Sequence, residues 1–76
     1  MAVYNRIEAQ RAVMESHVAT AAMHQNAYNH YASKRGKKNA EAAERFRKLV
    51  LAFNALAMEA RDTLADMLDQ QDMSND

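Results

Sequence analysis

The sequence predicts an all-α protein: an antiparallel two-helix hairpin, with long helices at about 3–35 and 39–70, that dimerises into a four-helix bundle. Three observations predict this class. The 76 residues include no proline and a single glycine. They are rich in the strong helix formers Ala, Leu, Met, Glu, Lys, Arg and Gln. Apolar residues also recur at helical spacing on both sides of the glycine.

The chain needs support beyond its own core. We expect residues 1–76 to form a single helical-hairpin domain, and a domain of this size rarely builds a sufficient core alone. Cysteine is absent, so no disulfide supplies that support. The favoured remedy is self-association, most simply a homodimer of hairpins.

The first predicted helix, 3–35, carries an apolar stripe when its residues are projected at 100° per step. Lys34 and Arg35 suit the negative end of its dipole, and Gly36 suits the left-handed conformation that closes a helix. Because the turn that follows is short, the second helix should run back beside the first. The core residues assigned to this helix are Ile7, Met14, Val18, Ala21 and Tyr28.

The second predicted helix, 39–70, begins at Asn39, a residue type that caps helix N-termini. Its apolar residues alternate by four and three, which is typical of a heptad seam, and others widen the stripe on one flank. Three apolar positions per heptad normally face two neighbours, as in a bundle. The polar segment 71–76 is expected to fray. The core residues assigned here are Phe46, Leu49, Val50, Phe53, Leu56, Ala60, Leu64 and Met67.

The charges are sorted along the chain although they sum to zero. Residues 34–48 hold seven basic and two acidic side chains, a net of +5, and residues 49–76 hold one basic and six acidic, a net of −5. The hairpin should therefore be basic at its turn and acidic at its open end. Head-to-tail pairing of two hairpins would place opposite charges side by side.

A second set of apolar residues lies off the main stripes, and we interpret it as a surface for a protein partner. Leu51 and Met58 lie one heptad apart, and Met23 lies on the first helix. Methionine is common on adaptable binding surfaces. This set favours a non-catalytic protein–protein interaction module, a regulator, inhibitor or small chaperone of bacterial or phage type.

Two alternatives stay open. One is a nucleic-acid-binding hairpin dimer, because cations hold phosphates and aromatic rings stack on unpaired bases. The other is a self-assembling structural element in which head-to-tail pairing continues beyond the dimer. The nucleic-acid site would consist of Tyr31, Lys34, Arg35, Lys37 and Lys38.

We expect no catalysis, cofactor or metal, because the sequence has no cysteine, glycine-rich phosphate loop or nucleophile motif. His17, His24 and His30 are spaced by seven and six residues, whereas a helical metal pair needs three or four. We expect these histidines to pack against the neighbouring helix. No stretch reaches the roughly 18 apolar residues of a membrane span, and a cytoplasmic location is expected.

Overall fold

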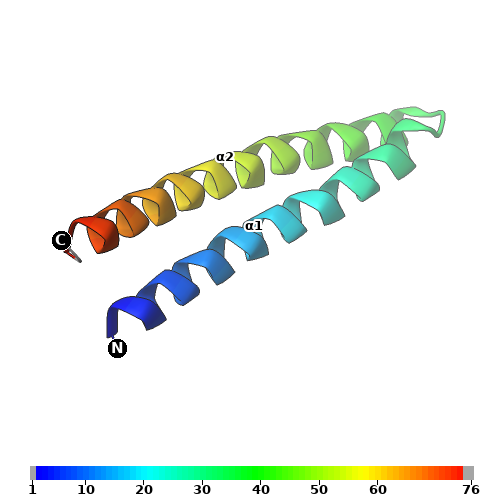
Figure 1. Ribbon diagram of the computed structural model, residues 1–76. Helices are drawn as coiled ribbons and strands as arrows, with labels where there is room; N and C mark the ends of the chain where they lie inside the picture. The colour runs from blue at the N-terminus through cyan, green and yellow to red at the C-terminus, as the bar shows by residue number, and fades with distance from the viewer. Residues whose placement is uncertain (1, 75–76) are drawn as a thin grey trace.

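The computed structural model consists of two α-helices that run antiparallel and are joined by a tight turn (Figure 1). Helix α1 spans Ala2–Ala32 and helix α2 spans Lys37–Ser74. The structure describes residues 2–74, with side chains described within 5–71. The beginning of α1 and the end of α2 lie together at the end of the hairpin opposite the turn (Figure 1). The predicted all-α class with two long helices is confirmed.

Helix α1 ends earlier than predicted. Its last residue is Ala32 rather than residue 35. The Ser33 N–H donates to the Asn29 carbonyl at 3.2 Å, and the Lys34 N–H makes a tighter bond to the Tyr31 carbonyl at 3.1 Å. The bond from Lys34 spans three residues rather than four, which is common at the end of an α-helix. It ends α1 before the cations of the turn.

Gly36 provides the reversal between the helices. Its φ is 112°, in the region that side chains with a Cβ rarely adopt. The Gly36 carbonyl accepts the Ala40 N–H at 3.0 Å, so α2 starts two residues before the predicted Asn39. Asn39 is therefore not the N-cap. It lies within the first turn, where its side-chain amide donates to the Arg35 carbonyl at 2.7 Å.

Helix α2 is longer than predicted at its other end, since it continues past residue 70 to Ser74. Gln71 is half-buried and lies four residues after Met67, so it occupies the next position on the side of α2 that faces α1. Fraying of the segment 71–76 stays a prediction, and its last two residues lie outside the described part of the chain.

The two helices meet along one seam whose positions alternate by three and four residues, the pattern of a coiled coil. All of the seam residues are buried or half-buried. The α1 side consists of Ile7, Gln10, Met14, His17, Ala21, His24, Tyr28 and Tyr31. The α2 side consists of Ala43, Phe46, Val50, Phe53, Ala57, Ala60, Leu64 and Met67.

Three residues assigned to the core lie outside this seam. Val18 is 53% exposed, Leu49 38% and Leu56 41%. A straight projection at 3.6 residues per turn drifts by about 20° per heptad from a seam of period 3.5. On α1 the straight projection therefore places the apolar Val18 in the core, whereas the seam contains the polar His17 beside it. The assignment of these three residues to a dimer core stays a prediction.

The hairpin is long and its core is thin. It measures 60 × 15 × 13 Å. Its radius of gyration is 17.3 Å, whereas a compact domain of this length has about 11 Å. Six hydrophobic residues are buried among those described, and four of the six are alanines. The chain exposes 5893 Å², about 1,200 Å² more than the roughly 4,700 Å² of a compact monomer of 8.6 kDa.

Candidate protein-interaction surfaces

A shallow apolar groove, which we call the Val18 groove, lies on one flank of the seam. It consists of two depressions that share Val18, and both helices line each of them. Polar atoms of Gln25, Asn54 and Arg61 lie among the apolar walls. The first depression is lined by Val18, Ala21, Ala22, Gln25, Val50 and Asn54. The second is lined by Met14, Val18, Ala57, Met58 and Arg61.

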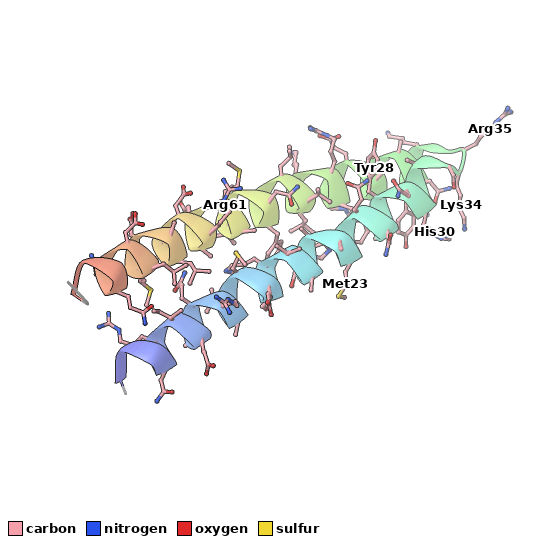
Figure 2. The ribbon with its side chains drawn as sticks, viewed as in Figure 1. Met23, Tyr28, His30, Lys34, Arg35 and Arg61 are labelled. Atoms are coloured by element: carbon pink, nitrogen blue, oxygen red, sulfur yellow. The ribbon has the colours of Figure 1, made fainter. Side chains whose placement is uncertain are left out.

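The residues predicted to bind a partner divide between two sides of the hairpin. Met58 lines the Val18 groove, and Leu51 lies seven residues before it on the same face of α2. Both are 57% exposed. Met23 is 68% exposed and points away from α2 (Figure 2). The structure therefore brings Met58 together with Val18, a residue that the sequence assigns to the core. Leu51 lies on the same face of α2 as Met58, and Met23 lies apart.

The opposite flank of the seam carries a second exposed apolar surface. Leu49 and Leu56 lie on α2, each one residue before a seam position, and Val13 lies in the equivalent place on α1. Val13 is 44% exposed, close to the values of the two leucines. This flank therefore exposes apolar side chains on both helices, as the flank with the Val18 groove does.

Polar residues occupy every second seam position of α1. Gln10 donates from Nε2 to the Ala60 carbonyl of α2 at 3.0 Å. The His17 ring lies 6.2 Å from the Phe53 ring, measured between centroids. The His24 ring lies 5.3 Å from Phe53. Both histidines pack against the neighbouring helix, as the sequence predicts.

His30 differs from the other two histidines. It is exposed, and its ring meets Tyr31 edge-on, with centroids 5.0 Å apart and planes at 82°. Tyr31 itself is half-buried and stacks on Phe46, with centroids 5.6 Å apart. One face of the Tyr31 ring is therefore covered by α2.

The turn presents a cluster of cations. Lys34 and Arg35 extend from it, and Arg35 reaches furthest from the helices (Figure 2). Lys37 and Lys38 follow in the first turn of α2, and all four side chains are exposed. The ion pairs found among the described residues involve none of them. The four cations predicted to bind phosphates therefore lie close together at the turn. Tyr31, the fifth residue of that predicted site, packs in the seam instead.

One surface pair has well-defined geometry. The Arg47 guanidinium donates two hydrogen bonds to the Glu44 carboxylate, at 2.6 and 2.9 Å. These bonds hold the pKa of Glu44 below its usual value and raise the pKa of Arg47. Because both side chains are about half exposed, water screens the pair and its contribution to stability is small.

No group of three or more His, Cys, Asp or Glu side chains in the described residues could hold a metal ion. Neither helix, as far as it is described, has a stretch long and apolar enough to cross a membrane. Comparison with protein-family models, curated proteins and solved structures found no match for this chain.

Proposed function

We propose that this chain is a non-catalytic, cytoplasmic interaction module, of bacterial or phage type, that binds another protein in the Val18 groove. It would act on that partner as a regulator, inhibitor or small chaperone. The observation that carries the proposal is the exposure of Val18 and Met58, each more than half exposed, in a groove lined by both helices. Apolar area left in water at one place favours association, at about 25 cal/mol per Å² covered.

The shape and chemistry of the groove favour a helical segment of the partner. A groove between two helices that lie side by side accepts an amphipathic helix. The apolar residues by which such a helix binds recur every three or four positions and act as its anchors. Val18, which lines both depressions, and Met58, which lines the second, would contact those anchors. Gln25, Asn54 and Arg61 would form the polar rim that most interfaces have.

The test compares two methionines. Met58→Glu places a charge in the groove, whereas Met23→Glu places the same charge on an exposed site away from it. Both variants should keep the helical circular dichroism of the unmodified chain, because both sites are exposed. A partner isolated with the unmodified chain should be lost with Met58→Glu and kept with Met23→Glu. Equal binding by both variants would refute the groove as the binding site.

The cations at the turn favour a second candidate, a nucleic-acid-binding hairpin. Lys34, Arg35, Lys37 and Lys38 are exposed and are not engaged by acidic side chains of the described chain. Under this candidate, replacing all four by Glu removes retardation of an RNA hairpin or a DNA duplex in a gel. The retardation by the unmodified chain should also fade as salt rises.

A further inference from the structure

Helix α2 carries an exposed row of residues at seven-residue intervals, which we call the outer row. Seven residues are close to two helical turns, so the members lie nearly above one another. All of them are exposed. None of the charged members takes part in the ion pairs found among the described residues. The outer row consists of Lys38, Arg45, Ala52, Glu59 and Asp66.

The outer row is charge-complementary to its own reverse. Ala52 is its midpoint, with a cation seven and fourteen residues before it and an anion seven and fourteen residues after it. If a second α2 lies antiparallel beside the first, Lys38 of each copy faces Asp66 of the other. In the same register Arg45 faces Glu59. A two-fold axis at Ala52 thus generates two ion pairs on each side of the axis.

An apolar row adjoins the outer row and is centred within half a residue of the same axis. Leu49 lies four residues after Arg45 and three before Ala52, a spacing that makes neighbours on a helix surface. Leu56 lies four residues after Ala52 on the other side of the axis. In the antiparallel register Leu49 of one copy therefore meets Leu56 of the other. The interface has an apolar centre and charged ends, as expected of a specific association.

We infer that a second copy of this chain covers the outer row together with Leu49 and Leu56, antiparallel to the first, and closes a four-helix bundle. The interface is isologous, because each copy contributes the same surface. Val13 of α1 lies on the same flank and adds to the covered area. This pairing leaves the Val18 groove open, so it stands independently of the proposed function.

Charge complementarity favours this flank, and like-charge repulsion sets the direction. Parallel pairing of the outer rows would set Lys38 against Lys38 and Glu59 against Glu59, and like charges oppose association. Antiparallel pairing on the groove flank, centred on Asn54, would set Arg47 of each copy against Arg61 of the other. The outer row of α2 has no such conflict in the antiparallel register.

The exposed area of the hairpin is sufficient for such an interface. The excess of about 1,200 Å² over a compact monomer exceeds the roughly 800 Å² per partner that a standard interface buries. Covering Leu49 and Leu56 would also complete the burial that three apolar positions per heptad predict for a bundle.

The test is a charge exchange followed by mass measurement. We expect light scattering after size-exclusion chromatography to give a dimer for the unmodified chain. Arg45→Glu replaces two attractions per dimer by two repulsions and should raise the dissociation constant about tenfold. The double variant Arg45→Glu with Glu59→Arg restores opposite charges and should restore the dimer. That rescue would not follow if Arg45 served only the fold of its own chain.

Two controls separate this inference from other outcomes. Met58→Glu should remain dimeric, so that loss of partner binding and loss of the dimer are distinguishable. Leu56→Glu should give a monomer, with the loss of helix that a thin hairpin suffers alone. A monomeric unmodified chain, a single reversal without effect or a double variant without rescue would each overturn the inference. So would a mass that grows beyond the dimer with concentration, since open head-to-tail assembly requires a different contact.

Discussion

The Tyr31 ring of α1 lies nearly parallel to the Phe46 ring of α2, with centroids 5.6 Å apart and planes inclined by 6°. Phe46 also meets the His24 ring at 5.8 Å. Offset stacking of this kind adds to the free energy gained from burial alone. These contacts fasten the hairpin near its turn, where Gly36 reverses the chain.

Truncation of Phe46 should therefore weaken the hairpin. Phe46→Ala removes the partner of both rings and should cost about 3 kcal/mol in the free energy of unfolding, the lower end for phenylalanine because the side chain is half-buried. Urea denaturation followed by circular dichroism at one protein concentration measures the change. Leu51→Ala, at an exposed site, should stay within about 0.5 kcal/mol of the unmodified chain. Similar losses for the two variants would contradict the seam.

The reversal at Gly36 makes a second prediction. A Cβ at this position would meet nothing closer than the Asn39 amide at 3.8 Å, so the penalty for a side chain is conformational rather than steric crowding. Gly36→Ala should lower the free energy of unfolding by about 1 to 2 kcal/mol, because its φ of 112° is unfavourable for an L-residue. Thermal unfolding compared with Lys37→Ala tests this, since Lys37 is exposed and helical. A neutral Gly36→Ala would show that the turn can reverse in another conformation.

The Glu44–Arg47 pair should make a pH-dependent contribution. Because Arg47 lowers the pKa of folded Glu44, the pair stabilises the fold above the ordinary Glu value of 4.5 and loses this effect as pH falls through the lowered pKa. The unmodified chain should thus melt above Glu44→Gln at pH 7, by a small margin. At pH 2 the two melting temperatures should converge. A margin that persists at pH 2 would assign it to something other than the charge of Glu44.

The α2 seam was largely predictable from the sequence, and the α1 seam was not. Phe46, Phe53 and Ala60 are apolar and heptad-spaced, so periodicity finds them. On α1 the equivalent positions include His17 and His24. Because these residues are polar, the periodicity of apolar residues does not identify them as seam positions. The signal that could identify this seam is the seven-residue repeat of Gln10, His17, His24 and Tyr31. The α2 seam has a repeat of the same length.

The candidate sites, like the seam, could be predicted only in part from the sequence. The Val18 groove was missed because Val18 had been assigned to the core, and only the three-dimensional register shows that it lies beside Met58. The single glycine predicts the position of the turn correctly. Its boundaries depend on backbone hydrogen bonds such as the one that the Ala40 N–H donates to the Gly36 carbonyl, and sequence patterns do not specify these.

The basic turn gives a prediction that distinguishes the two candidate functions. Under the protein-binding proposal, the purified chain should elute at low salt without nucleic acid. The ratio of absorbance at 260 nm to absorbance at 280 nm across the peak measures this. A peak that carries nucleic acid and releases it at high salt would favour the second candidate, because phosphate contacts weaken as salt rises. In that case the fourfold replacement of the turn cations should abolish the nucleic acid peak while leaving the helical content intact.

The two-fold axis inferred at Ala52 can be tested by chemistry that the native chain lacks. The sequence contains no cysteine, so a single introduced thiol reports its own position. Ala52→Cys places two thiols beside each other across the axis, and a short bis-maleimide should link the two copies in high yield. Asn54→Cys is also at an exposed site, but it lies two residues further along and 200° around α2, on the flank of the Val18 groove, and should link poorly. Equal yields for the two variants would show collisional cross-linking and would exclude a dimer axis at Ala52, whereas selective linkage would place the antiparallel register of the bundle to within one helical turn.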